Sequence, residues 1–474
     1  MLTRRQFLQL GAAGGAALVL PLERAVQAFA SGPSTPQFAA AFKRLPVLRP
    51  TSTDATTDYY NLALSPANAV ILPGKNTPVW AYNGLFPGPT IKAKANRRVV
   101  VTQTNKLATN ASTHLHGAHV APSSDGHPTD VFGPGQSKVY TYPNDQLAST
   151  LWYHDHTAHA TSRNVYMGLA GAYLIRDAVE AALGLPGGAY DITCIIQDRT
   201  FNADGSLSFV DSANAVLGNT VLVNGKPWPF LAVSGRKYRF RFVNGSNSRE
   251  YELALSSNKS LNQIASDGGL LAQTFVTPSI RLSPGERAEV VIDFAQYPAG
   301  TKIVLENLKG TATDGTDSIM RFDVGSPVSD TSKLPTTLRS ITKMTTAAVT
   351  RTFALSFDST RRLWVINGKP FDPNRIDVKP KLDAPEIWKI TNSSGMAHPF
   401  HIHLSMFQIL DRTKSGVVSK PGPGESGWKD TVRIDPGETV RFITKFTGFK
   451  GRYVYHCHNL AHEDHDMMAQ MEVV

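Results

Sequence analysis

Short runs of alternating apolar and polar residues recur along this chain, and each run is bounded by a glycine, proline or asparagine turn. Such alternation is typical of half-buried β-strands, because successive side chains of a strand point to opposite faces. An Asn-Gly turn followed by a strand-like run occurs three times: AYNGLFPGPTIKAKANRRVVVTQTN from Ala81, LVNGKPWPFLAVSGRKYRFRFVN from Leu222 and VINGKPFDPNRIDVKPKLDAPEIWKITN from Val365. The pattern therefore predicts an all-β protein with three internal copies.

Each copy continues with the same two signals in the same order. A Pro-Gly turn comes first, in VFGPGQSKVYTY from Val131, RLSPGERAEVVIDF from Arg281 and RIDPGETVRFITKF from Arg433. A closing strand follows, in STLWYHDH, GTKIVLEN and GRYVYHCH. Because chance rarely repeats three signals in one order, we expect three consecutive β-sandwiches of roughly 100–150 residues each. We place their domains at residues 31–178, 179–335 and 336–474, and we interpret the Ser/Thr-rich stretch 326–350 as a linker.

The composition and the charge exclude several other classes of protein. Hydrophobic residues make up 41% of the 474 positions and charged ones 18%, which is ordinary for a globular protein. The net charge of +10 comes from scattered lysines and arginines, with no run longer than two, so we do not expect nucleic-acid binding. Two cysteines cannot build a disulfide framework.

The N-terminus predicts export. MLTRRQFLQLGAAGGAALVLP places Arg4 and Arg5 before an apolar stretch that is too short and weak for a membrane span, and AFA ends at Ala30. Residues 1–30 resemble a bacterial twin-arginine export signal, which implies that the export machinery is a partner and that the protein is periplasmic, envelope-bound or extracellular. We expect no membrane span in the mature protein.

Ten of the fourteen histidines gather in four short motifs, all in the first and third copies. The motifs are THLHG with His114 and His116, WYHDH with His154 and His156, HPFHIH with His398, His401 and His403, and YHCHNLAH with His456, His458 and His462. The second copy has REYELAL and IVLENL at the equivalent places. So many imidazoles meeting without a metal would bury polar nitrogens with no partner, which is costly. The motifs therefore predict a metal site shared by the outer copies.

Because side chains alternate along a strand, the last motif presents residues on both faces of its strand. On one strand His456 and His458 point one way and Cys457 the other, so a single segment can serve two metal centres joined by a few covalent bonds. Two histidines, a thiolate and a weakly bound methionine are the ligand set of a blue-copper centre. The chain offers that set in His398, Cys457, His462 and Met467. Zinc is the rival metal, but it has no redox chemistry and its structural sites rarely use methionine.

The four motifs, their order and the threefold repeat resemble the multicopper oxidases of the laccase type. HCHNLAHEDHDMM is especially similar to bacterial spore-coat laccases and bilirubin oxidases. The resemblance implies three cupredoxin-like Greek-key β-sandwiches and four copper ions. It assigns type 1 copper to His398, Cys457 and His462 with Met467 axial, type 2 copper to His114 and His401, and the type 3 pair to His116, His154, His156, His403, His456 and His458. The offset from the cysteine favours Met467 over Met468.

The resemblance also implies a reaction. A reducing substrate would give single electrons to type 1 copper through the exposed edge of His462, and four electrons would reduce O₂ to water at the trinuclear cluster. Glu463 and Asp125 match family positions linked to proton delivery, and orienting the ligand histidines is an equally good reading of both carboxylates.

The sequence leaves alternatives open for the electron-donating substrate and for the role of the protein. Phenols or aromatic amines are the first choice, with bilirubin-type tetrapyrroles as a variant, and oxidation of Cu(I), Fe(II) or Mn(II) is the second. A non-catalytic exported copper-binding or envelope scaffold protein is the alternative from another class. We expect a monomer, because one chain already holds three domains. We interpret Cys194, Trp152, Trp364 and Trp388 as core residues, and His127 and His159 as surface or core histidines.

Overall fold

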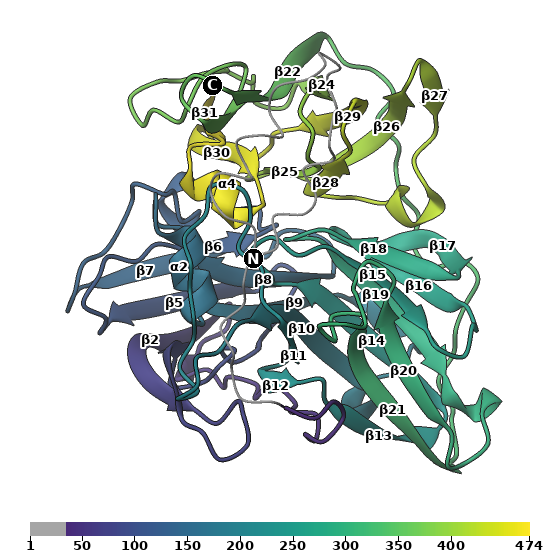
Figure 1. The fold of residues 1–474 in the computed structure, drawn as a ribbon. Coiled ribbons are helices and arrows are strands. Elements are labelled where there is room, and N and C mark those ends of the chain that lie inside the picture. Colours follow the sequence, from purple (N-terminus) through teal and green to yellow (C-terminus); the bar gives the residue numbers. More distant parts are fainter. Residues whose placement is uncertain (1–34) are drawn as a thin grey trace, which may run out of the picture.

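The computed structural model describes residues 35–474, and these residues form three pairs of β-sheets (Figure 1). The predicted export signal, residues 1–30, lies outside the described residues. The all-β class is confirmed, because each pair of sheets packs face to face around its own hydrophobic core, as cupredoxin-like sandwiches do. The sheets fall within residues 52–176, 191–327 and 349–473, and the domain boundaries given above stay a prediction.

The first sandwich joins two sheets. One has the order β1-β2-β5-β7 with β3 paired to β2, and the other has the order β4-β9-β8-β6. The bounds are β1 Ser52–Thr53, β2 Thr57–Ala69, β3 Thr77–Tyr82, β4 Ile91–Lys94, β5 Arg98–Asn105, β6 Thr113–His116, β7 Ser137–Tyr142, β8 Ser149–Asp155 and β9 Ala170–Arg176.

The middle sandwich is the largest. Its sheets have the orders β12-β11-β10-β14-β19-β16-β17 and β13-β21-β20-β15-β18. The bounds are β10 Asp191–Arg199, β11 Thr220–Val223, β12 Lys226–Pro227, β13 Phe230–Gly235, β14 Lys237–Asn244, β15 Tyr251–Leu255, β16 Leu261–Ser266, β17 Gly269–Thr277, β18 Ser279–Leu282, β19 Arg287–Asp293, β20 Lys302–Asn307 and β21 Ser318–Pro327.

The last sandwich lies above the other two in Figure 1. Its sheets have the orders β23-β22-β24-β29-β26-β27 and β28-β25-β30-β31. The bounds are β22 Val349–Asp358, β23 Leu363–Ile366, β24 Pro385–Asn392, β25 His398–Ile402, β26 Phe407–Lys414, β27 Val417–Ser419, β28 Thr431–Ile434, β29 Glu438–Lys445, β30 Gly451–Cys457 and β31 Met468–Val473.

Helices are short and few in the described chain. The α-helices are α2 Thr161–Met167, α3 Ala178–Ala182 and α4 Leu460–Asp464, and the 3₁₀ turns are η1 Pro122–Ser124, η2 Gly188–Tyr190, η3 Phe294–Gln296 and η4 Pro423–Glu425. Among residues 35–474, no helix has the length and apolar character that crossing a membrane requires.

The three Asn-Gly turns are built alike, which confirms the internal repeat. Both residues of each turn have positive φ, as a type I′ turn requires: Asn83-Gly84 at 52° and 70°, Asn224-Gly225 at 51° and 77°, and Asn367-Gly368 at 53° and 71°. In every copy the asparagine Oδ1 accepts a hydrogen bond from a strand N–H, at 2.7, 2.8 and 2.8 Å. The equivalent asparagine thus fixes the equivalent turn to β2, β10 and β22 in the three copies.

Antiparallel pairing sets the histidine motifs side by side within each outer sandwich. In the first, β6 pairs with β8 so that His114 lies opposite His154. In the last, β25 pairs with β30 so that His401 lies opposite His456. These registers bring two of the four motifs together within each outer sandwich.

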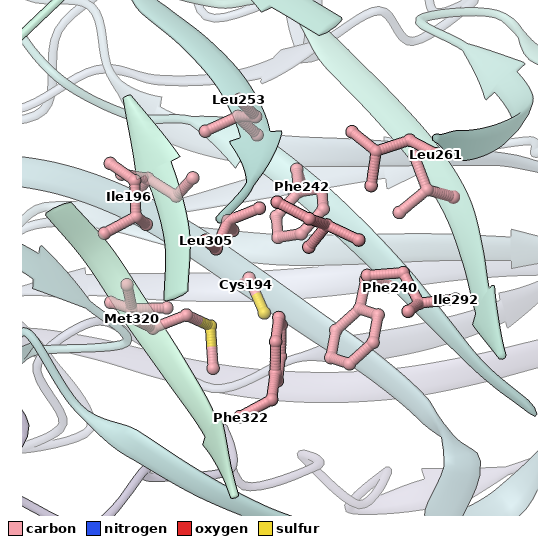
Figure 2. Packing of buried hydrophobic residues seen from close by; sticks show 14 of the residues in the cluster. Cys194, Ile196, Phe240, Phe242, Leu253, Leu261, Ile292, Leu305, Met320 and Phe322 are labelled. Carbon is pink, nitrogen blue, oxygen red and sulfur yellow. The ribbon is translucent and has the colours of Figure 1, made fainter. Parts of the chain in front are cut away.

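The core of the middle sandwich is densely aromatic (Figure 2). Phe240 is fully buried there, with its ring centroid 5.1 Å from that of Phe322, and the buried thiol of Cys194 belongs to the same cluster, as expected. Cys194 is therefore an inert core residue, since burial raises its pKa far above the ordinary value.

Replacing Phe240 by alanine should lower the free energy of unfolding by about 3–5 kcal/mol, because it removes a large side chain and leaves a cavity. Urea unfolding followed by circular dichroism measures the change. The control is Val276→Ala on β17, whose side chain is 60% exposed and whose loss should cost no more than about 0.5 kcal/mol. Equal losses in both variants would contradict the assignment of the core.

Candidate metal centres

One group of side chains surrounds the cysteine of β30. Its sulfur, Cys457 Sγ, lies 3.5 Å from His398 Nδ1 and 3.5 Å from His462 Nδ1, and the two ring nitrogens are 3.1 Å apart. All three residues are fully buried. Met467 is buried in the same hydrophobic cluster, and its backbone carbonyl accepts a hydrogen bond from the Cys457 N–H at 3.0 Å. The structure therefore brings together the residues predicted for one centre.

Hydrogen bonds on the far ring nitrogens fix which atoms face the sulfur. The Nε2–H of His398 donates to Ser394 Oγ at 2.8 Å, and the Nε2–H of His462 donates to the backbone carbonyl of Asn214 at 2.8 Å. Each Nδ1 is then an unprotonated acceptor aimed at the space beside Cys457. Two lone pairs and a thiol directed at one point favour a bound cation.

The structure corrects one expectation about His462. We expected an exposed ring edge, but this residue is 0% exposed because a segment of the middle sandwich covers it. Asn214, an exposed residue on that segment, supplies the carbonyl that receives the ring N–H. The sequence gives no hint of this cover, since it comes from another domain.

Trp364, which we interpreted as a core residue, is buried but also lies against this centre. Its ring centroid is 4.9 Å from that of His462 and 5.2 Å from that of His398. On its other side lies Phe357, 4.7 Å away between centroids and 43% exposed. An aromatic surface thus leads from solvent to the two histidines.

The other eight histidines of the four motifs meet between the first and last sandwiches. Their ligand atoms fall into three close groups, each with residues from both sandwiches: His114, His401 and His403; His116, His154 and His458; His156, His403 and His456. All eight are buried. The shared site predicted from the motifs is therefore present in the geometry.

Ring-nitrogen accounting shows that these groups fit a metal. His116 Nδ1, His154 Nε2 and both nitrogens of His458 are buried with no hydrogen-bond partner. Leaving each such atom unpaired costs on the order of 1–3 kcal/mol. The distances between facing nitrogens lead to the same conclusion. His456 Nε2 lies 3.2 Å from His156 Nε2 and 3.3 Å from His403 Nε2. A metal ion in each group would satisfy these nitrogens.

Strand β30 joins the two regions. Cys457, the last residue of β30, belongs to the group with His398, whereas His456 before it and His458 directly after the strand belong to two of the three histidine groups. The alternation expected from the strand period is therefore observed.

Three parts of the chain match the multicopper oxidase family by sequence, at residues 64–180, 152–316 and 334–474. A laccase of Bacillus subtilis is 39% identical over 466 residues, covering 84% of this chain and 90% of that protein. A bilirubin oxidase of Albifimbria verrucaria is 39% identical over 435 residues, covering 87% and 76%. The crystal structure of a laccase from Pediococcus acidilactici superposes with a TM-score of 0.86 at 34% identity, covering 94% of this chain and 95% of that chain.

The chain belongs to the multicopper oxidase family. The resemblance inferred from the motifs is confirmed, and so is the class of enzyme, an oxidoreductase that uses O₂. Membership implies copper as the cofactor, which agrees with the unpaired imidazole nitrogens and with the thiol grouped with two histidines described above. Residues 1–21 match the twin-arginine translocation signal, so the oxidase is exported by that route to the periplasm or beyond.

Two predicted carboxylates contact the grouped histidines of this oxidase. Asp125 Oδ2 accepts a hydrogen bond from His403 Nδ1 at 2.7 Å, and the Asp125 carbonyl accepts one from His114 Nδ1 at 2.6 Å. Glu463 Oε2 lies 3.1 Å from His456 Nδ1. Burial raises the pKa of Asp125 well above its usual range. Burial would also raise the pKa of Glu463, but the neighbouring imidazoles hold it below the usual value.

A third carboxylate escaped the sequence analysis. Asp430 is buried, its Oδ1 lies 2.9 Å from His116 Nε2, and its carbonyl accepts a hydrogen bond from His401 Nδ1 at 2.9 Å. It precedes β28 in a plain Lys-Asp-Thr stretch, with no histidine nearby in the sequence. Only the pairing of β28 with β25 brings it to the site.

Proposed function

We propose that this multicopper oxidase is laccase-like, oxidising phenolic or aromatic-amine donors one electron at a time and reducing O₂ to water. The observation that carries the proposal is the convergence of three histidine groups and one Cys-His group, joined by β30, with buried ring nitrogens left unpaired. The names laccase and bilirubin oxidase of its relatives agree with an aromatic donor.

We assign four coppers to these groups. His398, Cys457 and His462 would hold type 1 copper, with Met467 of the same buried cluster as a further ligand. His114 and His401, whose Nε2 atoms are 3.5 Å apart, would hold type 2 copper. The type 3 pair would be held by His116, His154 and His458 on one side and His156, His403 and His456 on the other. When bound, copper supplies one-electron redox chemistry at the first centre and the site of O₂ reduction at the other three.

The protein provides the connection between the two regions. The Cys457 side chain and the peptide groups on either side of it form an unbroken covalent route to His456, on β30, and to His458, directly after it. Because all three residues are buried, water is kept from that route. A donor can therefore react at one side of the last sandwich while O₂ is reduced at the other.

The surface near His462 supports an aromatic donor. Phe357 offers a partly exposed ring packed at a tilt against Trp364, which itself contacts His462. Offset or edge-to-face stacking of a phenol or aniline ring there would contribute about 0.5–1.5 kcal/mol. The Asn214 carbonyl prevents a donor from touching the His462 ring nitrogen, so we propose that electrons pass across this short contact.

Asp125 and Glu463 orient histidines, and their remaining oxygens suit proton handling. Asp125 Oδ1 and both Glu463 oxygens are buried without a hydrogen-bond partner, so each has acceptor capacity to spare. The hydrogen bond from His403 Nδ1 to Asp125 and the 3.1 Å contact of His456 Nδ1 with Glu463 leave the Nε2 atoms of both rings free for metal.

The test is oxygen uptake by copper-loaded protein with a donor panel of phenols, aromatic amines, bilirubin, Cu(I), Fe(II) and Mn(II). We expect blue protein with four coppers per chain, and one O₂ consumed for every four phenol molecules oxidised by one electron each. Turnover only with a metal ion would favour the metal-oxidase alternative. Bound copper without oxygen uptake for any donor would contradict the proposal and indicate a carrier or scaffold.

A further inference from the structure

The middle sandwich contributes no histidine, yet one of its arginines reaches the histidine groups. Arg287, the first residue of β19, is buried against both other sandwiches. Its Nη1 donates to Asp430 Oδ1 at 2.7 Å and its Nη2 donates to Asp430 Oδ2, so the guanidinium holds the carboxylate by both oxygens. Such forked pairing fixes the orientation as well as the position of a carboxylate.

Every N–H of the Arg287 guanidinium has an acceptor. Beyond Asp430, the Nε donates to the Thr150 carbonyl at 3.0 Å, the second Nη1 proton to the Gly285 carbonyl at 2.9 Å, and the second Nη2 proton to the Asp267 carbonyl at 3.2 Å. Thr150 belongs to β8 of the first sandwich and Asp430 to the last. One side chain therefore ties all three sandwiches together next to the metal site.

Asp430, whose carboxylate Arg287 holds, contacts two histidine groups, one through its side chain and one through its backbone carbonyl. Its Oδ1 receives the Nε2–H of His116, which leaves Nδ1 as the ring nitrogen free for a metal. Its carbonyl receives the Nδ1–H of His401, which leaves Nε2 facing His114. Partners of this kind set the tautomer and the ring angle of metal-binding histidines.

There is little space for Asp430 to move. A Cβ placed on Gly117, directly after His116, would come within 2.5 Å of Asp430 Oδ2 and 2.7 Å of Arg287 Nη2. Thr431 Oγ1 also donates to Asp430 Oδ1 at 2.9 Å. Close packing and hydrogen bonds thus both hold the Asp430 carboxylate in place.

We propose that Arg287 is a positioning residue through which the middle domain sets the type 2 copper site and the adjoining type 3 ligand, by holding Asp430 in place. The proposal rests on the copper assignments made above. A buried pair that served stability alone would need no contact with the histidines, whereas Asp430 bonds two of them.

The test uses copper-loaded wild type, Arg287→Gln and Arg287→Lys. Copper per chain, the type 2 electron paramagnetic resonance signal and copper affinity in a chelator titration are measured, with the type 1 blue absorption as internal reference. Arg287→Gln should keep the blue absorption but lose or shift the type 2 signal and raise the dissociation constant of the weakest copper about 10- to 100-fold. Arg287→Lys keeps the positive charge but loses the two-point hydrogen bonding to Asp430. It should therefore retain the copper and still shift the type 2 signal. This second variant keeps the test decisive should Arg287→Gln fail to fold.

Two controls separate positioning from general loosening. Arg239→Gln removes another buried guanidinium of the same sandwich, one that pairs with Glu289 and Glu180, and it should leave the type 2 signal unchanged. If Arg287 acts through Asp430, then Arg287→Gln combined with Asp430→Asn should match Asp430→Asn alone.

Three results would overturn the inference: a wild-type type 2 signal and affinity in both Arg287 variants, the same loss in Arg239→Gln, or additive losses in the double variant. Wild-type protein without any type 2 signal would instead refute the proposed function on which the inference rests.

Discussion

Replacing Cys457 with serine should bleach the copper-loaded protein and lower oxygen uptake with every donor by more than about 100-fold, since changes merely next to metal ligands already cost about 10- to 100-fold. A serine hydroxyl is a poor substitute for a thiolate toward copper. It also cannot hold copper between His398 and His462, whose Nδ1 atoms both face the sulfur. Visible absorption and an oxygen electrode measure the two effects.

The other cysteine provides the matched control. Cys194→Ala removes a sulfur from the core of the middle sandwich, where no histidine lies, and should leave colour and turnover at the wild-type level. Copper bound by the histidine groups should remain in Cys457→Ser, because their nitrogens are untouched. Substantial turnover by Cys457→Ser would show that electrons reach the histidine groups by another route.

Removing copper should make the protein sensitive to acid below about pH 6.5, the ordinary pKa of histidine. Burial lowers the pKa of His154 to about 4, and burial lowers those of His156 and His398 to about 3. The unfolded chain then binds more protons than the folded one between pH 6.5 and 3, so stability falls as the pH falls through that window. At about 1.4 kcal/mol per pKa unit, His154 alone costs about 3 kcal/mol at pH 4.

The combined loss of stability from several such histidines approaches the whole free energy of unfolding of a typical domain, which is about 5–15 kcal/mol. Bound copper occupies the ring nitrogens and must leave before they are protonated, so the loaded protein should keep its stability to lower pH. Thermal unfolding of both forms from pH 8 to pH 4 measures the difference. His159→Ala, at a residue whose side chain is 63% exposed, should not alter either curve. Parallel curves for the two forms would contradict copper binding by the buried histidines.

The sequence was informative wherever a single strand or turn decides the outcome. A strand period is enough to separate Cys457 from its histidine neighbours, and an Asn-Gly pair is enough to place a type I′ turn. The histidine motifs needed little more, because two on each outer sandwich lie on paired strands. The fold class and the grouping of the predicted residues follow from such local rules.

The features that the sequence did not reveal depend on contacts between domains or between strands that are far apart in the chain. The cover on His462 comes from Asn214, almost 250 residues away along the chain. Arg287 lies in a repeat that has no histidine, so nothing in its neighbourhood pointed to a metal. Asp430 is one of many aspartates until β28 and β25 pair. Packing between sandwiches has no short-range signature in a sequence.

The alternation along β30 also limits how such a protein can diverge. Inserting or deleting one residue between His456 and His458 would turn sulfur and imidazole toward the wrong faces, and no adjustment elsewhere could undo it. The spacing between the proposed donor side and the proposed oxygen side is accordingly fixed by the peptide repeat. In the proposed function, adaptation to new donors would fall to segments such as the one carrying Asn214, which can change in length without altering the strand beneath it.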